Sequence, residues 1–158
     1  MAESLADKIM QKVKQLDELY HSLMLVIAPL GAGKTTALLD VCDRTGAPLF
    51  NVNLELARLM LDLTQRQRTL QLPRLLREIV DNDENKMLLL DNIELLFDVG
   101  LKHDPLRLLQ GLSRNKTVVA AWNGSIDGDH MIYAEPDHPE YRRYMVRDFL
   151  VASPEVTT

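Results

Sequence analysis

Short runs of consecutive apolar residues alternate with helical patterns along this chain. Runs at 23–27, 87–90 and 117–121 predict buried strands, because a strand that is covered on both faces carries apolar side chains at every position. Weaker runs at 49–52 and 131–134 predict two further strands. Strands of this kind are typical of a parallel sheet.

The segments between the strands have the spacing of helices. Predicted helices cover residues 3–19, 34–44, 54–63 and 72–80, and a helical region in two pieces follows residue 91. The first of these helices is amphipathic. We expect Asn53 to cap the helix at 54–63 and Pro105 to begin the second of the two pieces, since both residue types favour helix starts. Strands that alternate with helices predict an α/β fold, with a mostly parallel sheet and helices on both of its faces.

Length and composition favour one globular domain. The chain has 158 residues, of which 46% are apolar and 26% are charged, and this composition excludes wholesale disorder. We expect the domain to cover residues 1–152 and a loose tail to follow at 153–158. The lone Cys42 excludes a disulfide framework. No segment is apolar for long enough to cross a membrane, and acidic residues occupy the place of a signal peptide's basic start, so we expect a cytoplasmic protein.

The strongest chemical signal is a glycine-rich loop between the strand at 23–27 and the helix at 34–44. It fits a phosphate-binding P-loop in which Ala28 replaces the usual first glycine. Glycines let the backbone curl so that successive N–H groups face a phosphate, and the helix start adds a positive dipole end. Lys34 would contact the β- and γ-phosphates of ATP, and the Thr35 hydroxyl would bind Mg²⁺. The residues that we expect to bind the nucleotide are Pro29, Leu30, Gly31, Ala32, Gly33, Lys34, Thr35 and Thr36.

A second signal lies at the end of the strand at 87–90. Asp91 directly follows four apolar residues, and in a P-loop protein this is the position of the Walker B aspartate that holds Mg²⁺. A carboxylate at a strand end is also a common helix cap, so the signal depends on the glycine loop that precedes it. We expect Thr35 and Asp91 to form the metal site. The expected catalytic residues are Lys34, Asp91, Asn92, Glu94 and Asn123.

The residue after this aspartate weakens the case for fast hydrolysis. Many nucleotide hydrolases place a glutamate there to activate the attacking water, whereas this chain has Asn92. An amide forms hydrogen bonds with water but cannot accept its proton. Glu94, just beyond the strand, and Glu55, after the strand at 49–52, are the two candidate replacements. The alternative for each of them is an ordinary solvated position on a helix.

Asn123 is the first polar side chain after the strand at 117–121. In P-loop folds with an additional strand, this position faces the γ-phosphate. The competing interpretation is a tight turn, because Asn123 precedes Gly124 and that dipeptide is a strong turn former. The sequence leaves both interpretations open.

The charge pattern limits the partners. A formal net charge of −5 argues against a protein that wraps nucleic acid with its whole surface. A solvated helix face is the favoured explanation for the densest basic stretch, so contact with DNA is expected to be indirect, and a local contact stays open as the alternative. The stretch contains Arg66, Arg68, Arg74 and Arg77.

The glycine loop and the strand that ends at Asp91 resemble those of P-loop NTPases, and more closely the AAA+/RecA-like core. A narrower resemblance is to the BrxF family, the small P-loop-containing proteins of bacterial BREX phage-defence systems. It rests on the short chain, the N-terminal helix, the glycine loop, the segment at 88–94 and the ending at 133–141. The resemblance implies ATP binding and a role in defence against phage, together with larger partner proteins that recognise and modify DNA.

Two features differ from a complete AAA+ module. Asn92 stands in place of the glutamate, and too few residues follow Asn123 to build a helical lid. Without a lid, another surface must cover the bound nucleotide, so we expect ATP to promote self-association into a homo-oligomer. Candidates for an arginine finger, which would contact the γ-phosphate held by a neighbouring copy, are Arg142, Arg143 and Arg114.

The sequence thus favours a nucleotide switch that binds ATP and hydrolyses it slowly, as a subunit of a phage-defence complex. Two alternatives remain, a small-molecule kinase and a scaffold that binds ATP without hydrolysing it. A kinase needs an arginine-rich lid, and the basic stretch at 66–77 comes too early in the chain for the usual one. Whether the protein is an enzyme at all is therefore left to experiment.

Overall fold

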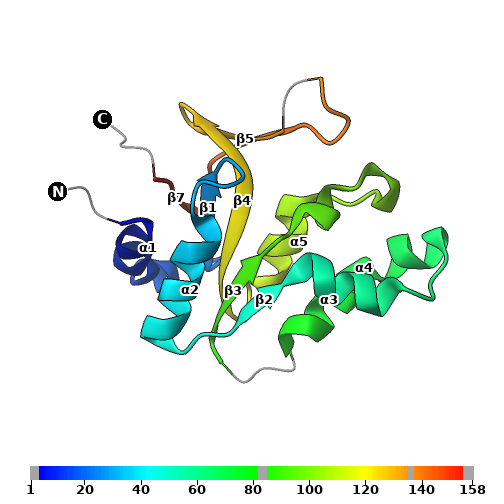
Figure 1. The fold of residues 1–158 in the computed structure, drawn as a ribbon, viewed down its shortest axis with the longest axis horizontal. Coiled ribbons are helices and arrows are strands. Elements are labelled where there is room, and N and C mark those ends of the chain that lie inside the picture. The colour runs from blue at the N-terminus through cyan, green and yellow to red at the C-terminus, as the bar shows by residue number, and fades with distance from the viewer. Residues whose placement is uncertain (1–3, 82–84, 135–136, 155–158) are drawn as a thin grey trace.

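A mostly parallel sheet runs through the centre of the molecule. The structure, a computed structural model, describes residues 4–81, 85–134 and 137–154. The parallel strands lie in the order β2 (Leu49–Asn51), β3 (Met87–Asp91), β4 (Thr117–Asp127), β1 (Leu23–Ala28) and β7 (Leu150–Ala152). The described residues form one domain, and the α/β class predicted from the sequence is confirmed (Figure 1).

Helices cover both faces of this sheet (Figure 1). One face packs against α1 (Leu5–Val13) and α2 (Lys34–Thr45). The opposite face packs against α3 (Val52–Met60), α4 (Gln65–Asp81) and α5 (Pro105–Leu112). The described chain also contains the short 3₁₀ helices η1 (Leu16–Glu18), η2 (Glu94–Phe97) and η3 (Val99–Leu101).

The two-faced cover explains why the central strands are apolar at every position. Along β1, Met24 and Val26 belong to the core beneath α1 and α2, whereas Leu25 and Ile27 belong to the core beneath α3 to α5. Successive side chains of a strand point to opposite faces, so both sets must be apolar when both faces are buried. Every residue of β1 is buried.

The strand β4 continues beyond the parallel sheet. Its second half pairs in antiparallel fashion with β5 (His130–Tyr133), which in turn pairs with β6 (Arg142–Met145). Gly124 lies within β4, at a point where a Cβ would come within 1.8 Å of the Ile132 carbonyl oxygen. The interpretation of Asn123 and Gly124 as a tight turn is therefore wrong. The turn that reverses the chain lies further on, at Gly128, which has a φ of +62°.

Several predicted helix boundaries need correction. The N-terminal helix ends at Val13 and is followed by η1, whereas a single helix over 3–19 was expected. The cap of α3 is Asn51, whose side chain accepts a hydrogen bond from the Leu54 backbone N–H, and not Asn53. Helix α4 begins at Gln65 and contains Pro73, so it is longer than the predicted span of 72–80. The predicted start of a helix at Pro105 is confirmed.

The C-terminal part of the described chain is more ordered than expected. After β4 it forms the strands β5, β6 and β7 and no helix, and β6 and β7 were not predicted. The Lys8 ammonium donates hydrogen bonds to the backbone oxygens of Ser153, at 3.1 Å, and Pro154, at 3.4 Å. The first residues of the tail predicted at 153–158 are thus held against α1, and residues 155–158 lie outside the described part.

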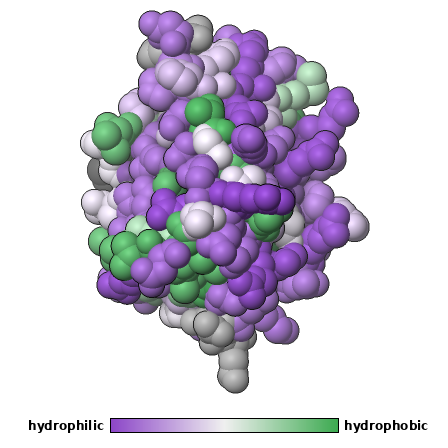
Figure 2. Space-filling model, turned by 90° about the vertical axis from the view of Figure 1, so that its right-hand side faces the viewer, coloured by the Kyte–Doolittle hydropathy of each residue, from purple (hydrophilic) through white to green (hydrophobic). Residues whose placement is uncertain are grey.

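The surface over the right-hand side of Figure 1 is mostly hydrophilic. Figure 2 shows hydrophobic side chains there in small patches between hydrophilic ones. Leu61 and Leu70, near the junction of α3 and α4, are among the exposed apolar residues of the chain. Within the described ranges, no helix combines the length and the hydropathy that crossing a membrane requires.

Candidate functional site

The predicted catalytic, metal-binding and nucleotide-binding residues lie at one edge of the sheet. In the parallel register, Ala28 of β1 lies beside Asn123 of β4, and Asn51 of β2 lies beside Asp91 of β3. These positions are the carboxyl ends of β1, β2 and β3 and the point where β4 leaves the parallel sheet. Open α/β sheets bind their ligands at this edge.

A pocket of about 260 Å³ opens here. It contains every predicted catalytic residue and both predicted metal ligands. Of the predicted nucleotide-binding residues, Pro29 and Ala32 do not line it. The lining residues are Leu30, Gly31, Gly33, Lys34, Thr35, Thr36, Asp91, Asn92, Glu94 and Asn123.

The glycine loop, residues 28–36, depends on two glycines for its shape. Gly31 has a φ of +83° and Gly33 a φ of +91°, in the region that other L-residues rarely adopt. Gly33 is the N-cap of α2, so the loop turns directly into the positive end of a twelve-residue helix. Such a helix start, with its free N–H groups, favours an anion.

We expect the substitution Gly33→Ala to lower the free energy of unfolding by about 1–2 kcal/mol, because a Cβ is strained at positive φ even though no atom lies within 4 Å of it. The matched control is Gly111→Ala. Gly111 lies within α5 and its Cβ would also meet nothing within 4 Å, so alanine there should be neutral or stabilising by up to about 1 kcal/mol. Urea unfolding of both variants tests this, and equal stabilities would contradict the role assigned to Gly33.

Lys34 is the first residue of α2. Its side chain is buried, whereas lysine side chains usually lie at the surface. Its ammonium donates hydrogen bonds to the backbone oxygens of Ala28 and Pro29, each at 2.8 Å. Burial lowers the pKa of Lys34, while the negative charges of Asp91 and Glu94 act in the opposite direction. The ammonium therefore lies within the glycine loop, near both carboxylates of the pocket.

Thr35 and Asp91 are in direct contact. The Thr35 hydroxyl donates to Asp91 Oδ2 at 2.5 Å, and the Asn92 backbone N–H donates to Asp91 Oδ1 at 2.9 Å. Asp91 is buried, and Asn92 adopts a left-handed backbone with a φ of +53°. The hydroxyl and the carboxylate are hard oxygen donors of the kind that Mg²⁺ prefers, and Mg²⁺ sites complete such a pair with phosphate oxygens and water. The pair fits a magnesium site of this type. No cluster of three or more His, Cys, Asp or Glu side chains able to hold a metal occurs among the described residues.

Glu94 and Asn123 both line the pocket and are in direct contact. Asn123 Nδ2 donates to Glu94 Oε1 at 3.1 Å. Glu94 begins η2, and Phe97 at the end of η2 stacks on Tyr133 of β5 with 3.5 Å between ring centroids. Burial raises the pKa of Tyr133 to about 12, with contributions from the negative charges of Glu140 and Glu94. The pocket is thus connected through η2 to the antiparallel extension of the sheet.

Asn53 supports the site in a way that the sequence did not reveal. Its side-chain oxygen accepts a hydrogen bond from the Leu95 backbone N–H, and its own backbone N–H donates to the Asn92 carbonyl, both at 2.8 Å. The start of α3 thereby holds the segment that carries Glu94. The sequence signal at Asn53 indicated a helix cap, and no local pattern reports a contact with a residue about forty positions away.

Glu55, the second candidate base, lies outside the pocket. It lines a different hollow together with Glu78 and is 3.5 Å from Arg58, with which it forms an exposed ion pair. Glu94 lies in the pocket, so the structure separates two carboxylates that the sequence left equivalent.

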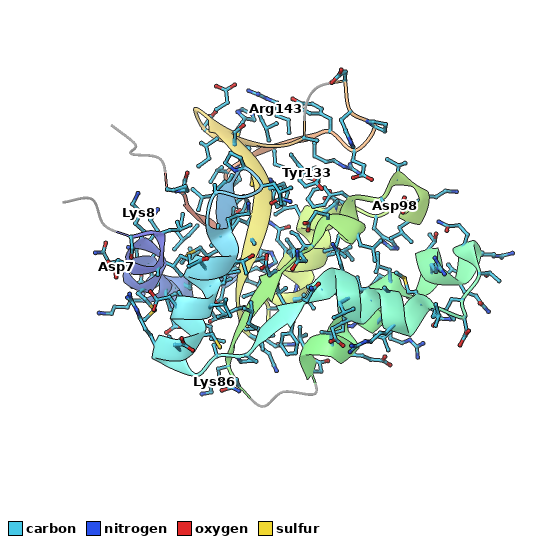
Figure 3. The ribbon with its side chains drawn as sticks, viewed as in Figure 1. Asp7, Lys8, Lys86, Asp98, Tyr133 and Arg143 are labelled. Carbon is cyan, nitrogen blue, oxygen red and sulfur yellow. The ribbon has the colours of Figure 1, made fainter. Side chains whose placement is uncertain are left out.

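The three candidate arginine fingers also lie outside the pocket. Arg142 and Arg143 form the start of β6. Arg143 makes an ion pair with Asp127 at 3.2 Å, and Arg142 is 3.4 Å from the His103 backbone oxygen. Arg114 precedes β4 and so lies near the opposite, amino edge of the sheet. Figure 3 shows Arg143 and Tyr133 at one end of the molecule and Lys86, beside the start of β3, at the other.

The pocket therefore combines groups of three kinds. A buried ammonium and a helix start favour a phosphate, a hydroxyl and a carboxylate suit a magnesium ion, and a second carboxylate held by an amide can accept a proton. The sequence matches no protein-family model and no curated protein.

Proposed function

We propose that this protein is a P-loop NTPase that binds Mg-ATP at the carboxyl edge of its sheet and acts as a slowly hydrolysing nucleotide switch. The observation that carries the proposal is the contact between Thr35, at the end of the glycine loop, and Asp91, at the end of β3. It joins the two segments that the sequence assigns to phosphate and metal, in one pocket with Lys34.

The strand order supports the AAA+/RecA-like branch of this class. β4 is inserted between β1, which leads into the glycine loop, and β3, which ends at Asp91. This is the additional-strand arrangement, and it places Asn123 of β4 between the two segments. The position matches the one from which an amide would contact a γ-phosphate.

The roles of the residues follow from their chemistry. The Lys34 ammonium and the N–H groups at the start of α2 would bind the β- and γ-phosphates, since charge-assisted hydrogen bonds are the strong ones. Mg²⁺, when bound by Thr35 and Asp91, would supply positive charge to the phosphate oxygens. Glu94 would take the proton from the attacking water, and Asn123 would hold the Glu94 carboxylate in place.

Slow turnover is expected for two reasons. Asn92 occupies the place where fast hydrolases have a glutamate, so the base comes from Glu94, three residues after Asp91. No helical lid covers the pocket among the described residues, so water screens the charges within it. A switch, which changes its binding surface with the bound nucleotide, needs only slow hydrolysis.

The biological setting is proposed from the sequence resemblance to the BrxF family. We propose that the protein acts in the cytoplasm as a subunit of a BREX-like phage-defence complex, with larger partners that contact DNA. The segments that support this are the glycine loop, residues 88–94 and the ending at 133–141. Of the last segment, residues 135 and 136 lie outside the described part of the chain.

Phosphate release measured with Mg-ATP, together with ATP binding by calorimetry, tests the proposed function. Binding with slow phosphate release supports the switch. Binding without any release would favour the scaffold, and release that requires an added acceptor would favour a kinase. The kinase is the less favoured alternative, because the arginines at 66–77 lie on α4 and none of them lines the pocket. Absence of ATP binding would overturn the proposal.

We expect Mg-ATP to shift the protein to larger species in sedimentation velocity, and ADP to do so less. Head-to-tail packing would cover the open pocket of one copy with the surface of the next and present an arginine to the γ-phosphate. Arg142→Ala and Arg143→Ala should reduce the shift. The matched control is Arg66→Ala, which removes the same charge from an exposed position on α4. A protein that stays monomeric at high concentration with saturating Mg-ATP would show that a different partner covers the site.

A further inference from the structure

A groove of about 170 Å³ lies between α4 and α5, and the residues of the proposed ATP pocket do not line it. Its apolar wall contains Leu76 and Leu112, which are buried, and Leu108, which is half-buried. Its polar lining consists of three arginines, Arg77, Arg107 and Arg114. The groove is smaller than the lower limit of about 300 Å³ for pockets that enclose small-molecule ligands.

Helical spacing explains how the groove forms. Leu76 and Arg77 follow Pro73 by three and four positions, so these side chains lie on one face of α4. Arg107 and Gly111 are four positions apart on α5. Gly111 has no side chain, and a Cβ there would meet no atom within 4 Å. The missing side chain leaves room for an apolar group from another molecule.

The arginines of the groove are not neutralised within the described chain. Arg77 and Arg114 are exposed and make no ion pair with any described carboxylate. Arg107 is 4.0 Å from Asp104, and its side chain is 86% exposed, so this pair is weak. Elsewhere on the surface, Arg44 is held between two aspartates at 2.8 Å. The groove is thus a local positive site on a chain whose net charge is −5.

A second hollow extends this positive region toward the amino edge of the sheet. It has a volume of about 340 Å³ and shares Arg114 with the groove. Lys86 and Lys116, beside the first residues of β3 and β4, also line it, together with one acid, Asp17. Lys86 lies at the end of the molecule opposite Arg143 in Figure 3.

We propose that the groove between α4 and α5 binds an acidic amphipathic helical segment of a partner protein. Carboxylates of the segment pair with Arg77, Arg107 and Arg114, and one of its apolar side chains enters the groove over Gly111. Helix-in-groove recognition uses this combination of an apolar anchor and charges beside it. A nucleic acid fits less well, because the apolar wall offers phosphates neither hydrogen bonds nor positive charge. The negative net charge of the chain also repels a long polyanion.

The test uses a fluorescein-labelled peptide of eighteen residues in which Leu and Glu follow a helical repeat, with anisotropy as the readout. A peptide with Lys in place of every Glu and a twenty-nucleotide oligothymidylate serve as the other probes. The variants are Gly111→Trp, which fills the groove, and Arg77→Glu, which reverses one of its charges. Arg66→Glu is the matched control, since it makes the same charge change on α4 outside the groove.

We expect the acidic peptide to bind and the lysine peptide not to bind. Its affinity should fall about tenfold or more in Gly111→Trp and in Arg77→Glu, and should stay unchanged in Arg66→Glu. ATP affinity should be the same in all variants, which keeps this test separate from the proposed function. Equal peptide binding by the wild type and Arg77→Glu would overturn the proposal.

Two other outcomes would show that the occupant of the groove is not an acidic segment of a partner protein. Oligothymidylate that binds more tightly than the peptide, and is lost in the same variants, would identify a nucleic-acid site. Self-association that disappears in Gly111→Trp, with no peptide binding by the wild type, would identify a second copy of the chain as the occupant. Circular dichroism checks that Gly111→Trp folds. If Gly111→Trp does not fold, peptide binding by Arg77→Glu still tests the proposal.

Discussion

Replacing Lys34 with alanine should lower the affinity for Mg-ATP by about a hundredfold or more. The ammonium now donates to the Ala28 and Pro29 oxygens within the glycine loop, near where the β- and γ-phosphates would lie. Two charge-assisted hydrogen bonds to phosphate contribute about 3 kcal/mol or more together, which corresponds to about a hundredfold in affinity. Calorimetric titration with Mg-ATP measures the loss directly.

The matched control for this variant is Lys14→Ala, which removes the same charge from an exposed position at the end of α1. It should bind Mg-ATP as the wild type does. Thermal unfolding of both variants shows whether the buried Lys34 also contributes to stability. Wild-type affinity in a folded Lys34→Ala variant would exclude the glycine loop as the phosphate site, and with it the proposed function.

Glu94→Gln should reduce ATP turnover by about a hundredfold while leaving Mg-ATP affinity nearly unchanged. The substitution keeps the size of the side chain and its contact with Asn123, but an amide cannot accept a proton from water. General-base catalysis contributes about a hundredfold or more to a rate, which sets the expected loss. Steady-state phosphate release at saturating Mg-ATP gives the turnover number.

Glu55→Gln is the control, because Glu55 has the same chemistry and follows a strand end in the same way but lies outside the pocket. Its turnover should match the wild type. A loss in Glu55→Gln without a loss in Glu94→Gln would reverse the assignment of the base. If both variants keep wild-type turnover, the proton acceptor comes from another molecule, and the proposed role of Glu94 is wrong.

The parts of the site that could be predicted from the sequence are those with a local pattern. Residues 23–27 are apolar at every position and lead into glycines and then a helix, so the order strand, loop, helix was readable without any knowledge of distant contacts. Asp91 was predicted to bind the metal from a local pattern too, because it directly follows four apolar residues. Parallel strands bring their carboxyl ends to one edge, which is why Asp91 and the glycine loop meet.

The parts that escaped prediction depend on contacts between distant segments. β7 has three residues, too few for a periodic pattern, and it is a strand because β1 offers it an edge. Lys34 is buried because two loop carbonyls receive its hydrogen bonds, whereas composition alone assigns lysine to the surface. Glu94 and Glu55 both follow strand ends, and only the packing of η2 and α3 places one inside the pocket and the other outside.

The first half of β4 pairs with parallel strands and its second half with an antiparallel strand. An added residue is therefore tolerated at some positions around β4 and not at others. Adding one residue near Asn123 would turn every later side chain of the strand to the other face, because strands alternate with a period of two. Ile132 and Tyr133 would then lose their partners at Ser125 and Gly124, and the stacking of Tyr133 on Phe97 would be lost. A residue added between Asp127 and His130 would lie outside the paired positions, so the two strands could keep their register. Natural variation in length should therefore collect at the turn between these two residues, while the span from Thr117 to Asp127 keeps a fixed number of residues.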